Sequence, residues 1–316
     1  MTGVPTVRNP AASGSTSSLR AWSAGHPVAA FLLLASILAY PVMSVPILAD
    51  HGVIPDPRTP QVPGVDTERL ASVLLVFVAL LPAALWVTWA VDGPAGVRAL
   101  VQRIFRWRIG ARWWLLVLAG LPTLTTTLAW GLGDSLRPVD MGPFVITQLF
   151  GLLVNLVLIN VWAETAWSGV VQTRLEQRHG LVRAALLTAV PFALAHMPLH
   201  FIGDFSLGSL STALVSLLIV CALVRLMIGV FLRATGHSIL AVALLHTSFN
   251  RSNNDEGLVA GLMEGDGRKL AGLLAVLVLT VAVATRRRPA PTRRLDPDST
   301  AASPAAGSTT PGEDPS

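Results

Sequence analysis

The sequence predicts an all-α fold: a polytopic membrane helix bundle with about eight transmembrane helices. Of its 316 residues, 52% are hydrophobic and 13% are charged, whereas a soluble globular protein carries roughly a quarter charged residues. The mean hydropathy is +0.61. The apolar segments follow one another so closely that residues 29–285 are expected to form one membrane-embedded domain.

Eight uncharged runs come close to the roughly 20 apolar residues that a helix needs to cross the hydrocarbon core. They are Ala29–Ala49, Leu70–Val91, Trp113–Gly133, Pro143–Ala163, Ala184–Phe201, Ser209–Val224, Ser238–Asn250 and Leu270–Thr285. The fourth run is expected to continue as helix towards Gln177, and the sixth to Leu232. The seventh is short for a span, and it is counted as one because the charge distribution requires a crossing there.

The basic residues divide unequally between the two sides that these crossings define. With the N-terminus in the cytoplasm, the inner segments hold 17 of the 23 basic residues, which is the positive-inside pattern. The outer segments keep Arg58, Arg69, Arg137, Arg251, Arg268 and Lys269. We therefore expect an integral, multi-pass protein of the cell membrane with both termini cytoplasmic, and no nucleic-acid partner, because the arginines flank apolar runs rather than a soluble face.

The two ends of the chain differ in composition from the membrane domain. Residues 1–28 and 286–316 are rich in Ser, Thr, Ala, Pro and Gly, which predicts two disordered cytoplasmic tails. The segment Val97–Arg112 fits either a short helix on the inner membrane surface or a solvated basic loop. The single cysteine, Cys221, excludes an intramolecular disulfide and a clustered-thiolate metal site.

One acidic side chain lies deep within the predicted spans. Glu164 needs polar partners there, because a carboxylate near the bilayer centre is costly on its own. Helical spacing places Asn160, Glu164, Ser168 and Gln172 on one face at i, i+4 steps. This polar stripe is expected to face the interior of the bundle.

Two further predicted helices carry a histidine at a similar depth. At about 1.5 Å per residue, Glu164, His196 and His246 all lie roughly 14–20 Å from the inner boundary. We therefore expect the three to meet. A carboxylate and two imidazoles in a partly dry cavity have the composition of a hydrolytic site, in which the carboxylate takes a proton from water.

The three residues could act with or without a bound metal. Glu164, His196 and His246 are candidate ligands of one divalent metal such as zinc, which needs an open position for catalysis, and the same residues can polarise a water molecule without metal. Asn250, one turn beyond His246, is the candidate oxyanion donor. His200 follows His196 by four residues, but Pro198 lies between them, and we give this pair little weight.

Three short motifs resemble those of the CPBP (Abi) family of intramembrane proteases, which includes the CAAX prenyl endopeptidases. They are Ala163-Glu-Thr-Ala-Trp-Ser-Gly169, Phe192-Ala-Leu-Ala-His196 and His246-Thr-Ser-Phe-Asn250. The resemblance covers roughly Asn155 to Asn250. It implies an eight-helix fold and a site at Glu164, His196, His246 and Asn250.

The first motif departs from the family pattern at two positions. The first glutamate of the family's pair, which the resemblance implies is the catalytic base, is Ala163 here, and the usual arginine is Ser168. Neighbouring helix positions point about 100° apart, so Glu164 cannot take the missing place without a rotation or a local distortion. Arg225 on the sixth span is a candidate for the missing charge, although we expect it to snorkel to the interface.

These observations leave three hypotheses. The first is an intramembrane endopeptidase that hydrolyses a peptide bond of a membrane-associated or lipid-tethered substrate, which reaches the site from the cytoplasmic side. The second, motivated by Ala163 and Ser168, is a catalytically inactive family member that binds a membrane partner or confers immunity. The third is a transporter or haem protein that uses the intramembrane polar residues.

Overall fold

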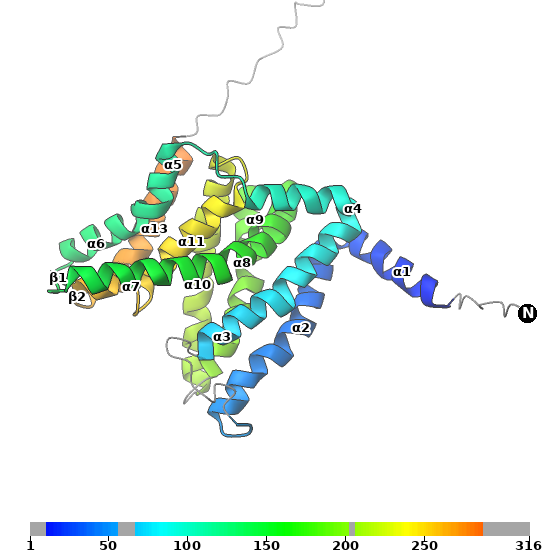
Figure 1. Ribbon diagram of the computed structural model, residues 1–316, viewed down its shortest axis with the longest axis horizontal. Coiled ribbons are helices and arrows are strands. Elements are labelled where there is room, and N and C mark those ends of the chain that lie inside the picture. Colours follow the sequence, from blue (N-terminus) through cyan, green and yellow to red (C-terminus); the bar gives the residue numbers. More distant parts are fainter. Residues whose placement is uncertain (1–10, 56–66, 202–205, 287–316) are drawn as a thin grey trace, which may run out of the picture.

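The computed structural model describes residues 11–55, 67–201 and 206–286, and this part of the chain is a bundle of helices (Figure 1). The first half comprises α1 (Ala11–Gly25), α2 (Pro27–Asp50), α3 (Thr67–Leu74), η1 (Leu75–Leu80), α4 (Leu81–Ile104), α5 (Ala111–Leu115), η2 (Leu116–Gly120), α6 (Leu121–Gly131), β1 (Ser135–Leu136) and α7 (Met141–Val154). The second half comprises η3 (Asn155–Asn160), α8 (Val161–Ala166), η4 (Trp167–Gln172), α9 (Thr173–His196), η5 (Met197–Phe201), α10 (Leu207–Ala234), α11 (Ile239–Asn253), α12 (Leu258–Leu262), β2 (Met263–Glu264) and α13 (Gly267–Thr285).

Within the described residues, six helical segments are long and apolar enough to cross a membrane. They are Pro27–Asp50, Arg69–Ile104, Ala111–Gly131, Met141–His196, Leu207–Ala234 and Gly267–Thr285. The segment Met141–His196 contains both the fourth and the fifth predicted spans, and the chain turns sharply between them at Gly180. The seventh predicted span is α11, which has only 15 residues. The all-α membrane bundle is therefore confirmed, and the count of eight is approximate.

Two glycines break helices that otherwise run on without interruption. Gly93 has φ 66° and Gly180 has φ 73°, a left-handed region that glycine enters without a steric penalty. Beyond Gly93, the second part of α4 turns across the end of the bundle (Figure 1). Most of Val97–Arg112 therefore divides between helix, up to Ile104, and a loop that leads to Gly110.

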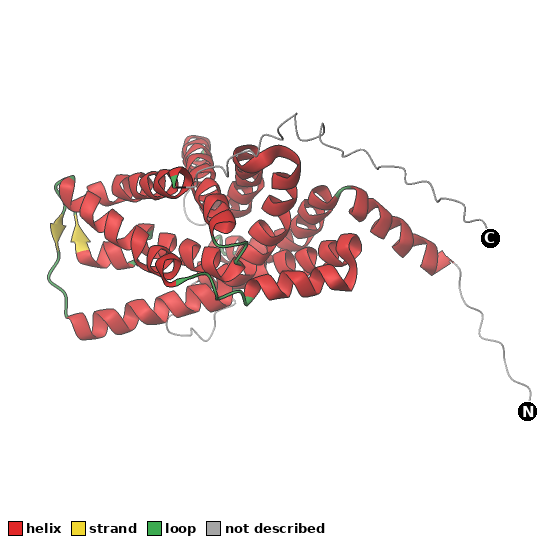
Figure 2. Cartoon of the chain, turned by 90° about the horizontal axis from the view of Figure 1, so that it is seen from above, coloured by secondary structure: helices red, strands yellow, loops and turns green. Residues whose placement is uncertain are grey.

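The N-terminal segment corrects one expectation. Residues 1–28 were expected to be disordered, yet Ala11–Gly25 is a helix that projects from one side of the bundle (Figure 2). It contacts α4, where the guanidinium of Arg20 lies 4.5 Å from the ring centre of Trp89. A few such contacts are enough to hold a helix whose own composition is poor in large apolar residues. Residues 1–10 and 287–316 lie outside the described part of the chain.

A small two-stranded antiparallel sheet lies at the edge of the bundle farthest from α1 (Figure 2). Strand β1 pairs with β2, with Ser135 opposite Glu264 and Leu136 opposite Met263. Nearby, the backbone N–H of Gly267 donates to a carboxylate oxygen of Asp134 at 2.9 Å. These contacts tie the start of α13 to the end of α6.

The core lies where α8 meets its neighbours. α8 packs against α4 and α11, and α9 packs along α10. Trp167 and Phe192 meet there edge to face, with ring centres 5.4 Å apart. The short helix α8 thus packs among longer helices, which hold the Glu164 side chain in place.

Candidate active site

The helix that carries Glu164 has an unusual local geometry. α8 has only six residues, and a π-helical turn precedes it (η3) and another follows it (η4). Such turns contain one extra residue per turn and occur often at functional sites. Neither η3 nor η4 contains a proline or was foreseen from the sequence.

The polar stripe on this segment faces the bundle interior, as expected. Asn160 donates to the Thr247 hydroxyl at 2.9 Å, and Gln172 donates to the backbone carbonyl of Arg225 at the same distance. Ser168 donates to Glu164 Oε2 through a very short hydrogen bond. Asn160, Glu164, Ser168 and Gln172 are all buried. The stripe therefore joins the segment η3–α8–η4 to both α10 and α11.

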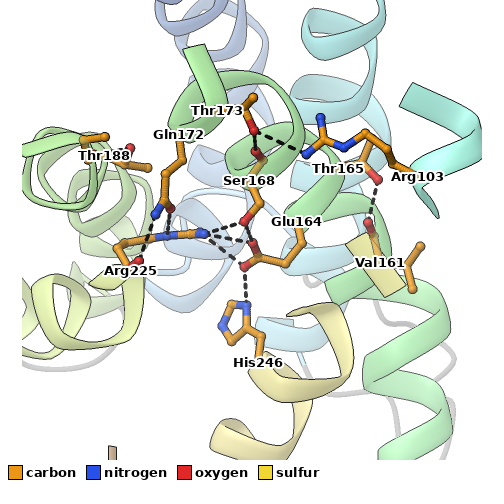
Figure 3. Close-up of polar contacts among 11 residues, drawn as sticks. Arg103, Val161, Glu164, Thr165, Ser168, Gln172, Thr173, Thr188, Arg225 and His246 are labelled. Atoms are coloured by element: carbon orange, nitrogen blue, oxygen red, sulfur yellow. Dashed lines mark hydrogen bonds and ion pairs between the residues drawn. The ribbon is translucent and has the colours of Figure 1, made fainter. Parts of the chain in front are cut away.

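Arg225 is the main partner of Glu164, and this corrects our expectation that it snorkels to the interface. Its Nη2 lies 2.9 Å from Glu164 Oε2, its Nη1 lies 3.2 Å from Oε1, and both side chains are 0% exposed. Nη2 also lies 2.7 Å from Ser168 Oγ, and Nε donates to Gln172 Oε1 at 3.0 Å. Figure 3 shows the guanidinium between these partners. The four hydrogen bonds favour the buried position of the guanidinium over a position at the membrane interface, because they compensate its charge in the interior.

His246 approaches the same carboxylate from α11. Its Nδ1 donates to Glu164 Oε1 at 2.8 Å (Figure 3). Because an ionised carboxylate only accepts hydrogen bonds, Nδ1 carries a proton, and in the neutral ring Nε2 has the lone pair. The pair thus has the form of a carboxylate–imidazole dyad in which the acid fixes the orientation of the ring.

The ring of Phe192 lies between His196 and this dyad. His196 Nδ1 donates to the Phe192 carbonyl at 2.8 Å, which again leaves Nε2 with a lone pair. The Phe192 ring centre is 4.7 Å from that of His196 and 5.9 Å from that of His246. The expected meeting is therefore confirmed directly for Glu164 and His246, whereas His196 reaches them through Phe192.

A cavity of about 960 Å³ borders the site. His196, His246 and Asn250 line it, and so does His200, to which we had given little weight. Ala163 also lines the cavity, whereas Glu164 is fully buried behind it. The position that the resemblance assigns to a catalytic carboxylate therefore faces the cavity and carries a methyl group.

This geometry changes the role that Glu164 can play. We expected its carboxylate to take a proton from water in the cavity. Both of its oxygens instead accept hydrogen bonds from Arg225, Ser168 or His246, and none of its surface is exposed. Glu164 is placed to orient His246, whose ring lines the cavity and can act as the base there.

The expected metal ligands do not form a metal site. Within the described ranges, no three His, Cys, Asp or Glu side chains are grouped so that they could hold a metal ion. A cation bound to Glu164 would have to displace the guanidinium of Arg225, and zinc needs at least three protein ligands. The donor set of Glu164, His196 and His246 therefore does not fit the metal that we considered.

The cavity reaches the surface at one end of the bundle. Its lining there includes Asp255 and Glu256, whose side chains are 76% and 81% exposed. Arg69, Arg251 and Lys269 line the same end. In the orientation that the basic residues predict, this end faces outside, opposite to the cytoplasmic access that we had expected.

Two contacts near the site were missed from the sequence. Thr247 accepts the hydrogen bond from Asn160, and Arg103 on α4 donates to the Gly169 carbonyl and to the Thr173 hydroxyl at 3.2 and 3.3 Å. Arg103 was visible only as one of many interface arginines. Nothing in the spacing of α4 relates it to the π-helical turn η4.

The fold and the cavity define the class: an integral, multi-pass, all-α membrane protein with a buried polar site that adjoins an open cavity. Residues 144–252 match the sequence model of the family described as type II CAAX prenyl endopeptidase Rce1-like. The matched segment contains Glu164, His196, His246 and Asn250, and it confirms the resemblance carried by the three motifs. No curated protein matches the chain.

Proposed function

We propose that the protein is an intramembrane endopeptidase that hydrolyses a peptide bond of a membrane-associated or lipid-tethered substrate. The observation that carries the proposal is the 2.8 Å hydrogen bond from His246 to Glu164 at the wall of a cavity that His196 and Asn250 also line. A carboxylate that holds an imidazole in one tautomer makes the other ring nitrogen an effective general base. The matched family supports this reaction class.

The proposed reaction uses groups of the chain at each step. His246 Nε2 takes a proton from water while His196 Nε2 accepts the second water hydrogen and fixes the molecule. The water oxygen bonds to the carbonyl carbon, and the Asn250 amide donates to the oxyanion that forms. The carbon–nitrogen bond then breaks, and His246 returns its proton to the amine that leaves.

The cavity wall supports a membrane-associated or lipid-tethered substrate. Met43, Leu75, Val76, Leu80 and Ile159 line the cavity on the side of α2, η1 and η3. These apolar side chains suit the apolar part of a segment that has left the bilayer. The polar residues of the same lining suit its peptide backbone.

Single substitutions in the full-length purified protein test this proposal. With fluorogenic membrane peptides, His246→Ala is expected to lower turnover by a factor of about 10² to 10⁴, the usual contribution of a general base. His196→Ala and Glu164→Gln are expected to lower it less, since the first positions water and the second orients His246. His179→Ala, an exposed histidine on α9, is the matched control. Equal turnover in all five proteins would refute the proposal.

A second function is favoured by one observation: Ala163 faces the cavity where the family pattern has a carboxylate. We propose as the alternative a catalytically inactive member that binds a membrane partner or confers immunity. Ala163→Glu is then expected to create peptide cleavage that the natural chain lacks. Ala195→Glu, which introduces a carboxylate at another cavity-lining alanine, is the control. Cleavage by the unmodified protein excludes this alternative.

We also propose that the protein lies in the cell membrane with both termini in the cytoplasm, because 17 of the 23 basic residues then fall on the inner side. Cysteine variants at Arg137 and Arg178, in a Cys221→Ser background, test the orientation. A membrane-impermeant thiol reagent added to intact cells is expected to label the first and not the second. The reverse pattern inverts the topology.

A further inference from the structure

One buried cation in the cavity wall forms no hydrogen bond or ion pair with a carboxylate of the described residues. Arg251 on α11 lines the cavity, is 8% exposed, and its Nε is buried without a hydrogen bond in the described part of the chain. Arg251 follows Asn250 directly in the sequence. It is therefore a charged group of the cavity that the proposed reaction does not use.

The hydrogen bonds that Arg251 donates within the described residues all go to neutral acceptors. Nη2 donates to Gln148 Oε1 through a very short hydrogen bond and to the Glu256 backbone carbonyl at 2.9 Å. The Glu256 carboxylate lies instead 3.5 Å from Arg69. The Glu256 carboxylate therefore acts on Arg251 only from beyond hydrogen-bond distance. A buried guanidinium whose hydrogen-bond acceptors are all neutral stabilises an anion that comes near it, because a carboxylate compensates the desolvated charge.

The same end of the cavity has more positive than negative charge. Arg69, Arg251 and Lys269 line it together with two carboxylates, Asp255 and Glu256. Asp255 is already bound by Arg268, which lies outside the cavity lining, and Lys269 lies 3.9 Å from the same oxygen. An anionic group from elsewhere would therefore find an attractive field along this wall.

We propose that Arg251 forms a subsite for a carboxylate of the peptide substrate. This inference rests on the proposed function and specifies its substrate class. Five residues separate Arg251 from His246, about 7.5 Å along the helix axis, which is roughly two residues of an extended peptide. The carboxylate, from an Asp or Glu side chain or from the chain terminus, thus lies about two residues from the bond that is cut.

The depth of Arg251 favours a peptide over a lipid phosphate. Lys269 has a side chain that is 74% exposed and lies at the surface end of the cavity, where a headgroup phosphate arrives first. Arg251 is buried and lies beside Asn250, which the reaction places at the oxyanion. A peptide that extends from the reacting carbonyl passes Arg251 before it leaves the cavity.

Binding, rather than turnover, tests this subsite. Fluorescent apolar peptides that end in a carboxylate or an amide, and peptides with an internal Asp or Asn, are titrated into full-length His246→Gln protein in detergent, which does not cleave them. We expect the acidic member of one pair to bind about tenfold more tightly than its neutral partner, the effect of one charge-assisted hydrogen bond. The pair that shows the preference identifies the source of the carboxylate.

Two variants in the same background assign the preference to a residue. Arg251→Gln is expected to abolish it, whereas Arg137→Gln, which removes an exposed arginine outside the cavity lining, is expected to keep it. Equal binding of acid and neutral peptides before any further substitution overturns the subsite even if Arg251→Gln does not fold. A preference for the acidic peptide that survives Arg251→Gln also overturns the subsite. So does a result in which phosphatidylglycerol, but not phosphatidylcholine, displaces the acid and amide peptides equally. The acid preference is measured without cleavage, so it stands or falls separately from the endopeptidase activity.

Discussion

Arg225 on α10 donates to both carboxylate oxygens of Glu164 on α8, and neither side chain has any exposed surface. The pair explains how an acid and a guanidinium can both be buried within the bundle, because each compensates the charge of the other.

Removing one partner of this pair is expected to destabilise the fold strongly. Arg225→Ala leaves the Glu164 carboxylate buried without its cation, which costs about 3–5 kcal/mol. Thermal unfolding of the purified protein in detergent measures the loss. Arg233→Ala, which breaks a partly exposed ion pair with Glu176, is the control and is expected to cost about 1 kcal/mol or less. Similar losses for both variants contradict the prediction.

The guanidinium is expected to reach the same place from position 168. Ser168 Oγ lies 2.7 Å from Arg225 Nη2, so a side chain that starts at Ser168 points at the buried charge. We expect the double variant Ser168→Arg, Arg225→Ser to unfold at a higher temperature than Arg225→Ser alone. Ser168→Arg alone puts two guanidinium groups in one buried site and is expected to unfold earlier than the wild type. A double variant no more stable than Arg225→Ser argues against interchange.

Zinc is expected to bind well below stoichiometry. Glu164 is engaged by Arg225, and His196 and His246 alone provide too few ligands for a catalytic zinc site. Elemental analysis of protein purified from zinc-supplemented medium measures the content, with His246→Ala as the comparison. A full equivalent of zinc that disappears in this variant contradicts the arrangement described above.

His237 is expected to make stability depend on pH. It lies in the loop before α11 with φ 64°, and partial burial, followed by the nearby positive charge of Arg103, lowers the pKa of its imidazole. The unfolded chain then binds the proton more readily, so stability falls as the pH drops below about 6.5. His237→Asn, which also tolerates positive φ, is expected to reduce the fall in unfolding temperature between about pH 7 and pH 5. An unchanged fall rules His237 out as its source.

The span positions could be read from the sequence because long uncharged runs have one stable place in a bilayer. The predicted run Ser238–Asn250 became α11, Ile239–Asn253, and Leu270–Thr285 became α13, Gly267–Thr285. Helix α1 was missed because contacts with α4, which local composition does not encode, hold it.

The site was predictable in composition and only partly in geometry. Asn160, Glu164, Ser168 and Gln172 share a face because helical spacing dictates it. Ala163 lines the cavity and Glu164 does not, as expected for neighbouring helix positions that point about 100° apart. The expectation that Arg225 snorkels to the interface was wrong, because the partners that hold it in the interior lie more than 50 residues away in the sequence. Arg251 gave no signal beyond its charge, because its isolation depends on where Glu256 and Asp255 find their own partners.

The π-helical turn η3, which precedes α8, sets the rotational phase of the residues that follow it. One residue added to or removed from a helix turns everything beyond it by about 100°, which is the angle between Ala163 and Glu164. A single-residue deletion within Asn155–Asn160 is thus large enough to exchange which of the two looks into the cavity. The helical register that η3 sets therefore decides, as much as the identity of residue 163 does, whether a methyl group or a carboxylate faces the cavity.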